Sequence, residues 1–116
     1  MTTDPSCIFC KIVLGEIPAD EVVRDEHVVA FRDLHPVAPT HILVVPTTHL
    51  AHLSAFTAGA DPAVAARLLA VAAELGTRFG PHGYRVVTNE GRDAGQSVSH
   101  LHLHVLAGRE MHWPPG

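Results

Sequence analysis

Histidine and aliphatic residues alternate between residues 100 and 105, and this alternation constrains the fold more than any other feature of the chain. Successive side chains of a β-strand point to opposite faces, so the segment predicts a strand with two chemically different faces. One face carries His100, His102 and His104, and the other carries Leu101, Leu103 and Val105. The aliphatic row needs a hydrophobic core behind it, which would anchor the imidazoles on the opposite side of the sheet.

Other short segments also have the composition of strands, being rich in β-branched or aromatic residues with turn residues between most of them. They span residues 22–24, 28–31, 42–45 and 84–87, and the histidine strand spans residues 101–106. A long helix is predicted after Asp61, which can cap it, with Pro62 at its first position and apolar residues at 64, 68, 71 and 75. A short helical pattern lies between residues 7 and 14. Together these elements predict an α+β fold with a mostly antiparallel sheet of about five strands, one long helix and one short helix.

Length and composition predict one domain over residues 1–116. A single core is usually about 100 to 150 residues long, and the 47% apolar content of this chain can supply one. No repeat, low-complexity tract or Ser/Gly-rich linker divides the sequence.

Charge and hydropathy exclude several classes of partner. The net charge is −4 and the few Lys and Arg residues are scattered, so polymeric nucleic acid is not an expected partner. The apolar run at residues 63–75 is interrupted by Arg67 and Glu74, and it is shorter than the about 20 residues that a membrane span needs. The amino terminus lacks the charged and apolar regions of a signal peptide. We therefore predict a cytoplasmic protein that does not bind membranes.

The three alternating histidines indicate chemistry rather than a solvated strand face, which would be the better interpretation of a lone histidine. A strand rises by about 3.3 Å per residue, so His100 and His104 are expected about 13 Å apart at Cα. Zn–N bonds are only about 2.0 to 2.1 Å long, and one ion could therefore be shared by both ends only with difficulty. His102 is the candidate nucleophile, because a neutral imidazole can attack phosphorus or a carbonyl and form a covalent intermediate.

The loop at residues 89–97 combines glycines with amide and hydroxyl side chains directly before the histidine strand. Such a loop can bring backbone N–H groups close to a phosphate. It can equally be an ordinary connection between two strands, and the residues alone leave both interpretations open.

The Cys7-x-x-Cys10 pair has three interpretations. It could be a pair of small buried residues, a redox pair, or half of a tetrahedral zinc site. A redox role is the weakest, because no thioredoxin-like βαβ unit surrounds the pair, and a structural disulfide does not suit a cytosolic protein.

These motifs together resemble one known family. The loop at residues 89–97 followed by His100-Leu-His-Leu-His104-Val-Leu resembles the signature of the histidine triad (HIT) superfamily. Residues 38–46, residues 83–87 and the tail at residues 108–116, which ends in Trp-Pro-Pro-Gly, resemble its Hint branch, the purine nucleoside phosphoramidases. The resemblance spans essentially the whole chain.

The resemblance implies a HIT-like fold, a homodimer with the long helices at its interface, and hydrolysis of purine nucleoside 5′-phosphoramidates of the AMP-amine or AMP-lysine type. By matching positions, His102 would attack the α-phosphorus and form a nucleotidyl-histidine that water cleaves. His104 would contact the phosphate, and His41 would support the triad. The tail, residues 108–116, would shape the site of the partner subunit.

The resemblance also implies which residues form the nucleotide pocket for AMP or GMP conjugates. The phosphate or the leaving group would be held by Asn89, Gly95, Gln96 and Ser97. The ribose would be held by Asp33 and Leu34. The walls of the base pocket would be Ile8, Phe9, Ile12 and Phe31.

A structural Zn²⁺ is implied by the same resemblance, since some HIT proteins, including bacterial ones, carry such a site. The matching ligands are Cys7, Cys10, His49 and His100. This departs from animal Hint proteins, which lack the cysteine pair. His100 could therefore be a zinc ligand, an active-site residue, or both. His52 is a competing ligand because it lies three residues beyond His49.

Two other functions stay open. One is dinucleoside polyphosphate hydrolysis, as in the sister Fhit branch, although the Trp-Pro-Pro-Gly tail favours the Hint branch. The other is a zinc-stabilised nucleotide-binding scaffold protein in which turnover is incidental.

Overall fold

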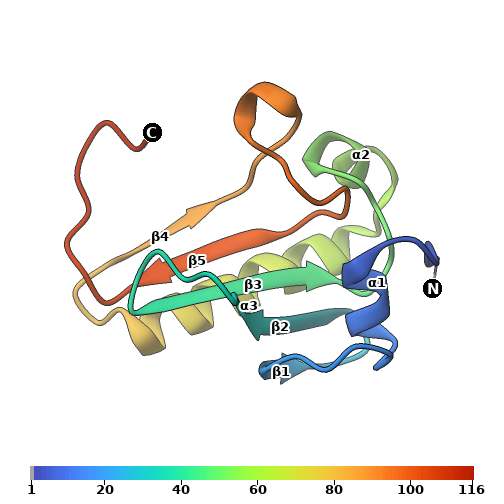
Figure 1. Ribbon diagram of the computed structural model, residues 1–116, viewed down its shortest axis with the longest axis horizontal. Coiled ribbons are helices and arrows are strands. Elements are labelled where there is room, and N and C mark those ends of the chain that lie inside the picture. Colours follow the sequence, from blue (N-terminus) through green and yellow to red (C-terminus); the bar gives the residue numbers. More distant parts are fainter. Residues whose placement is uncertain (1) are drawn as a thin grey trace.

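The computed structural model describes residues 2–116 and contains one five-stranded antiparallel sheet with helices on both faces (Figure 1). The strand order is β1-β2-β3-β5-β4. The elements in chain order are α1 (Ile8–Val13), β1 (Glu21–Arg24), β2 (Val28–Arg32), β3 (Thr40–Pro46), α2 (Leu53–Gly59), α3 (Pro62–Phe79), β4 (Tyr84–Val87), the 3₁₀ helix η1 (Arg92–Ala94) and β5 (Leu103–Ala107). The predicted α+β fold with five antiparallel strands is therefore confirmed.

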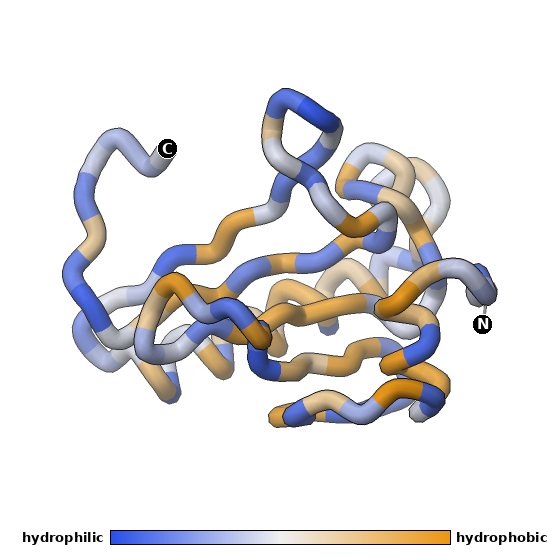
Figure 2. Tube along the Cα trace, viewed as in Figure 1, coloured by the Kyte–Doolittle hydropathy of each residue, from blue (hydrophilic) through white to orange (hydrophobic). Residues whose placement is uncertain are grey.

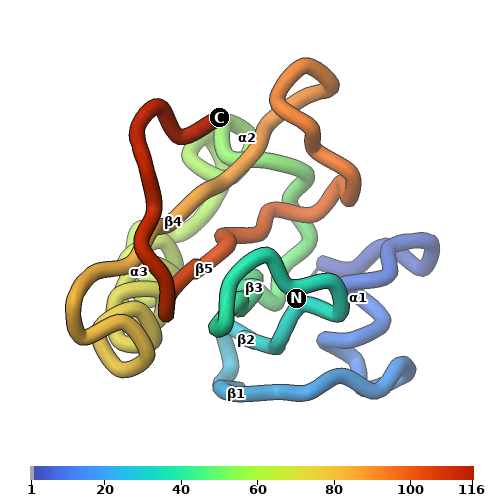
Figure 3. The backbone as a smooth tube through the Cα atoms, turned by 60° about the vertical axis from the view of Figure 1, so that its left-hand side comes forward, coloured from blue at the N-terminus to red at the C-terminus, as the bar shows by residue number. Residues whose placement is uncertain are grey.

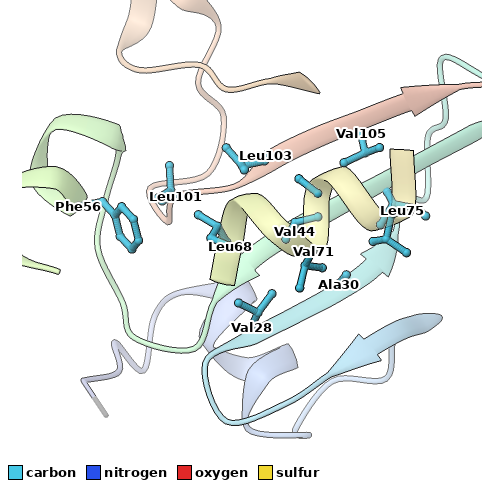
Figure 4. Close-up of a cluster of buried hydrophobic side chains, with 12 residues drawn as sticks. Val28, Ala30, Val44, Phe56, Leu68, Val71, Leu75, Leu101, Leu103 and Val105 are labelled. Atoms are coloured by element: carbon cyan, nitrogen blue, oxygen red, sulfur yellow. The ribbon is translucent and has the colours of Figure 1, made fainter. Parts of the chain in front are cut away.

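Each face of the sheet has its own hydrophobic cluster. Helix α3 packs on one face against the aliphatic side chains of β2, β3 and β5 (Figure 4). Helix α1 packs on the other face, against residues of β2 and β3 that include Val29, Phe31 and Leu43. Strand β3 lies between β2 and β5, all of its residues are buried, and its central stretch is hydrophobic in colour (Figure 2). The sheet therefore separates an α3 side from an α1 side.

The imidazoles lie on the α1 side. Leu101, Leu103 and Val105 belong to the cluster beneath α3, so the predicted alternation of faces holds. His104 pairs with Leu43 across the β3–β5 ladder, and paired residues of antiparallel strands point to the same face. Leu43 belongs to the α1 cluster. The face that carries the histidines is thus the one that α3 leaves uncovered.

Helix α3 begins and ends where the sequence predicts. The side chain of Asp61 accepts a hydrogen bond from the backbone N–H of Ala63 at 2.9 Å, Pro62 is the first helical residue, and Gly80 follows the last one. Its buried residues include Leu68, Val71 and Leu75. None of the helices formed by residues 2–116 is long and apolar enough to cross a membrane.

Helix α2 has no counterpart in the sequence prediction. It is short and contains Ser54, Thr57 and Gly59, which weaken a helical pattern. Its cap is His52, whose side chain accepts a hydrogen bond from the backbone N–H of Ala55 at 3.3 Å. Histidine is not one of the preferred capping residues, so the usual start signal is missing.

Strand β5 begins at Leu103, two residues later than predicted, so His100 and His102 lie in the segment that leads into the strand. The reason is Pro46, which has no N–H to donate to a ladder. The Pro46 carbonyl instead faces the Nε2 atom of His100 at 2.9 Å, and the N–H of Leu101 donates to Leu50 at 2.7 Å. A side chain and a loop carbonyl thus replace the last rungs of the β3–β5 ladder.

The contact between α3 and the sheet predicts where the chain is most sensitive to truncation. Leu75→Ala, at a residue 2% exposed in the centre of this cluster, should lower the free energy of unfolding by about 2 to 5 kcal/mol. Thr77→Ala, on the exposed side of the same helix, should change it by no more than about 0.5 kcal/mol. Urea titration of both variants measures the difference, and equal losses would contradict this assignment of the core.

Candidate functional site

His102 is held in one tautomer by the backbone. Its ring is buried, and its Nδ1 atom lies 2.7 Å from the carbonyl oxygen of His100. A carbonyl oxygen only accepts hydrogen bonds, so Nδ1 must carry the proton and donate it. The Nε2 atom of the neutral ring therefore keeps its lone pair. This is the protonation pattern that a nucleophilic imidazole requires.

His104 is oriented by a second chain of hydrogen bonds, which begins at the backbone of Val37. The Val37 N–H donates to Nδ1 of His41 at 3.1 Å, so the proton of a neutral His41 ring must be on Nε2. That Nε2 atom lies 2.9 Å from Nδ1 of His104 and 3.4 Å from Oδ2 of Asp33. His104 accepts at Nδ1, and its own proton is consequently on Nε2. His102 and His104 thus present opposite chemistry, a lone pair and an N–H group, with ring centroids 5.0 Å apart.

Burial keeps the imidazole rings of His41 and His104 neutral. Burial lowers the pKa of His104 to about 4, with further lowering from His102 and His41 and a smaller opposing effect from Asp33. Burial also lowers the pKa of His41, again opposed by Asp33. Both rings are therefore uncharged near neutral pH, which agrees with the tautomers deduced from their hydrogen bonds.

Asp33, His41 and His104 also have ligand atoms within 4.8 Å of one another, a spacing that a metal ion could use. The Val37 N–H argues against a metal there. It occupies Nδ1 of His41, so Nε2 of the neutral ring bears the proton and has no lone pair for a cation. We interpret these residues as a hydrogen-bond chain rather than as a metal site.

A second cluster brings together Cys7, Cys10, His49 and His100, whose ligand atoms all lie within 4.8 Å of one another. The sulfur of Cys10 lies 3.3 Å from Nδ1 of His49 and 3.6 Å from Nδ1 of His100. The two Nδ1 atoms are 3.2 Å apart, and the sulfur of Cys7 lies 3.4 Å from the Nδ1 atom of His100. For a tetrahedral zinc with Zn–N about 2.0 to 2.1 Å and Zn–S about 2.3 Å, the ligand atoms would be about 3.3 to 3.8 Å apart. The donor set and its spacing fit zinc.

The surroundings of the cluster prepare its atoms for a cation. Nε2 of His100 faces the Pro46 carbonyl, so it carries the proton and leaves Nδ1 free to ligate. Burial lowers the pKa of His100 to about 4, which keeps the ring neutral. The backbone N–H of Asp4 donates to the sulfur of Cys10, and that of Cys10 donates to the sulfur of Cys7, each at 3.4 Å. Burial raises the pKa of the Cys10 thiol. A thiolate at this position would therefore need a bound cation to stabilise its charge.

His52 does not belong to this cluster. Its Nδ1 atom caps α2 and lies 3.5 Å from a carboxylate oxygen of Glu90. Of the two competing histidines, the structure brings His49 to the cysteines.

The glycine-rich loop is ordered by two of its predicted phosphate-binding residues. Gln96 donates from Nε2 to the carbonyls of Ala51 and Val98, and its Oε1 accepts from the N–H of Gly91. Asn89 donates to the Ala94 carbonyl, but its Oδ1 atom is buried and has no hydrogen-bond partner among residues 2–116. A buried acceptor without a partner is rare in folded proteins, and this oxygen lacks the donor that an N–H or O–H group would supply. The two remaining predicted residues of this loop, Gly95 and Ser97, are exposed.

The predicted base and ribose residues divide into a buried and an exposed group. Phe9, Ile12 and Phe31 are buried on the α1 side of the sheet. Ile8 and Leu34 are 48% and 89% exposed. The exposed pair is available to a ligand, whereas the buried residues pack together. The sequence offered no signal for one further contact, the T-shaped packing of the Phe9 ring and the His102 ring, with centroids 5.1 Å apart.

The tail leaves the sheet at the carboxyl end of β5, whereas His102 precedes its amino end (Figure 1). The His112 carbonyl accepts a hydrogen bond from Arg85 at 2.9 Å, and Arg109 donates to the Val37 carbonyl at 3.0 Å. Trp113 is 83% exposed. Figure 3 shows the same tail running away from β5 in a second view. Two hydrogen bonds thus attach the tail to β4 and to the β2–β3 connection of the same chain, while Trp113 stays exposed.

Comparisons with known proteins agree with the resemblance seen in the sequence. The family model described as HIT domain matches residues 14–111. A 13.2 kDa HIT-like protein of Azospirillum brasilense is 44% identical over 112 residues, which cover 95% of this chain and 92% of that protein. A 14 kDa zinc-binding protein of Zea mays is 44% identical over 124 residues, which cover 97% of this chain and 90% of that protein.

A solved structure agrees as well. The crystal structure of a HIT family hydrolase from Legionella pneumophila has a TM-score of 0.89 and 45% identity, covering 96% of this chain and 100% of that chain. The family model spans most of the sequence, and the fold and the paired tautomers of His102 and His104 suit a histidine triad. This chain therefore belongs to the HIT domain family.

Proposed function

We propose that this protein is a nucleotide hydrolase that cleaves purine nucleoside 5′-phosphoramidates through a covalent nucleotidyl-histidine. The observation that carries the proposal is the 2.7 Å contact between Nδ1 of His102 and the His100 carbonyl, because it leaves the lone pair of Nε2 free for attack. The resemblance of the tail to the Hint branch supports the amidate as the substrate, and the structural similarity to the HIT family hydrolase of Legionella pneumophila supports the reaction class.

In the first step, Nε2 of His102 attacks the α-phosphorus. An N–P bond to His102 forms, the P–N bond to the amine breaks, and the departing amine takes up a proton from solvent. The ring becomes positively charged, and its Nδ1–H group keeps its hydrogen bond to the His100 carbonyl, which stabilises that charge. In the second step water attacks phosphorus, the bond to His102 breaks, and AMP and a proton are released.

His104 would act as a fixed hydrogen-bond donor to the phosphoryl oxygens. Its Nε2–H group is maintained by His41, whose proton is in turn positioned by Val37 and Asp33. A donor already oriented towards an oxygen that gains negative charge costs little reorganisation during the reaction. His41 is therefore a positioning residue in this proposal.

The remaining predicted residues would complete the nucleotide pocket. We assign Gly95, Gln96 and Ser97 to the phosphate side of the pocket, and Asn89, whose unpartnered Oδ1 atom accepts hydrogen bonds, to the departing amine. The ribose would contact Asp33 and Leu34, and the base would lie against Ile8, with Phe9, Ile12 and Phe31 forming the floor behind it.

A zinc ion in the second cluster would be held by Cys7, Cys10, His49 and His100. With four protein ligands it would cross-link α1, the segment after β3 and the segment before β5, a structural role rather than Lewis-acid chemistry. The zinc-binding relative from Zea mays supports this assignment.

We further propose a cytoplasmic homodimer of one-domain chains, with residues 108–116 reaching the partner's site. Two exposed apolar residues support the dimer, namely Leu69 of α3, which is 62% exposed, and Val86 of β4, which is 41% exposed. Strand β4 is at the edge of the sheet, and within residues 2–116 it pairs with β5 alone, so its other edge can pair with another strand. The second candidate function, dinucleoside polyphosphate hydrolysis, is favoured less because of the tail.

Turnover of an AMP amidate tests the function. His102→Ala should lower the rate of AMP release by at least roughly a thousandfold, because it removes the nucleophile. His27→Ala, at a half-exposed imidazole that lies beside Glu26, is the matched control and should retain the wild-type rate. Acid quench with radiolabelled substrate should trap nucleotidyl-protein in wild type only. If wild type is no faster than His102→Ala, the enzymatic proposal fails and the scaffold function gains support.

Metal analysis tests the zinc assignment. Wild type should carry about one zinc ion per chain, and Cys10→Ala should lose most of it because a thiolate ligand is gone. His52→Ala should retain the metal, since the His52 ring caps α2 instead. Negligible zinc in wild type, or loss of zinc in His52→Ala with retention in Cys10→Ala, would contradict the ligand set.

Light scattering after gel filtration tests the homodimer. Wild type should elute with twice the 12.4 kDa mass of the chain, and Leu69→Glu combined with Val86→Glu should shift it to the monomer mass because charges would be buried at the interface. Leu14→Glu, at an exposed leucine that ends α1, should leave the mass unchanged. A monomeric wild type would refute this part of the proposal.

A further inference from the structure

Phe9 links the metal cluster to the candidate nucleophile. It lies between Cys7 and Cys10 on α1, and its side chain is buried. Its ring is nearly perpendicular to that of His102, with centroids 5.1 Å apart and an interplanar angle of 85°. The same ring lies 6.0 Å from that of His100, at 72°. One aromatic side chain therefore contacts both the ligand His100 and the nucleophile His102.

A second connection runs through the backbone. The Nδ1 atom of His100 faces the cysteines, while its carbonyl oxygen accepts the hydrogen bond that sets the tautomer of His102. The ring of His100 is completely buried and is held on its other side by the Pro46 carbonyl. The position of that carbonyl consequently depends on where the His100 ring is anchored.

We propose that Phe9 is a positioning residue that holds the His102 imidazole in its attacking orientation, and that the Cys7–Cys10–His49–His100 cluster fixes Phe9 and the His100 carbonyl together. Two cysteines flank Phe9 within one turn of α1, so ligating them determines the place of the ring between them. The proposal rests on the proposed function only for the reaction that His102 performs. The orientation of the ring can be measured without substrate.

This positioning role is distinct from a contact with the base, which the place of Phe9 behind Ile8 in the proposed pocket would also allow. A residue that only contacts the base affects substrate binding, and its loss raises KM with little change in kcat. A residue that holds the nucleophile affects the chemical step, because a small misplacement of reacting atoms lowers the rate steeply. The two roles can therefore be distinguished by whether the loss of Phe9 changes KM or kcat.

The decisive comparison uses Phe9→Leu with Val13→Ala as its control. Val13 lies on the same helix, is 6% exposed against 7% for Phe9, and packs in the same cluster, but it has no ring contact with His102. With zinc bound, Phe9→Leu should lower the single-turnover rate of nucleotidylation roughly ten- to a hundredfold, with KM within roughly twofold. Val13→Ala should keep the wild-type rate. A change in KM alone for Phe9→Leu would overturn the positioning role.

The imidazole ¹⁵N NMR spectrum of His102 supplies a readout that is independent of turnover. Wild-type, zinc-loaded protein should show the Nδ1–H tautomer, and Phe9→Leu should show a mixture of tautomers, while Val13→Ala stays like wild type. Removal of zinc by a chelator should produce the same mixture in protein that remains folded by circular dichroism. If the chelated chain unfolds, the zinc-loaded Phe9→Leu spectrum alone decides.

An unchanged His102 spectrum in Phe9→Leu, or in folded zinc-free protein, would overturn the proposal. Failure of the proposed function would look different. Wild type would then release no AMP from the amidate, yet the tautomer of His102 would still respond to Phe9 and to the metal.

Discussion

The hydrogen bond from Nδ1 of His102 to the carbonyl of His100 is the interaction on which the rest of the site depends. It selects one tautomer and leaves a lone pair on the opposite ring nitrogen. The residue that supplies this carbonyl also directs its side chain into the cluster with Cys7 and Cys10. The buried His100 therefore belongs to both centres at once, through its ring to the cluster and through its backbone to the nucleophile. A choice between the two roles is unnecessary, because they use different atoms.

The sheet makes this arrangement possible because one face packs against α3 and the other face carries the imidazoles. Helix α3 covers one face with the principal aliphatic cluster, and that packing anchors the strands that carry His41 and His104. The opposite face carries α1 and the imidazole of His104. Two adjacent rings then differ in chemistry although they are the same residue type. His102 is polarised by a carbonyl and His104 by a neighbouring N–H, so one presents a lone pair and the other a proton.

Most of the fold could be predicted because its signals are local. The period-two pattern of the strands, the cap at Asp61 and the proline at the start of α3 each lie within a few residues of what they specify. The exceptions arise from tertiary contacts. Helix α2 is capped by a histidine, which is not a usual start signal. Strand β5 begins late because Pro46 cannot donate to the ladder and because the His100 ring takes its carbonyl.

For the site, the sequence by itself determined which residue types are present, the alternation of histidines with aliphatic residues, and the family that this combination resembles. Side-chain alternation is a property of the backbone, so the separation of histidines from leucines needs no tertiary information. Only the tertiary structure decided which side chains contact one another in the site. His41 meets His104 across 63 positions of sequence and Cys7 meets His100 across 93, and Phe9 reaches His102 from another element. Protonation patterns and metal geometry depend on such contacts, because a hydrogen bond or a ligand distance is set by where the chain brings two atoms, not by their spacing along it.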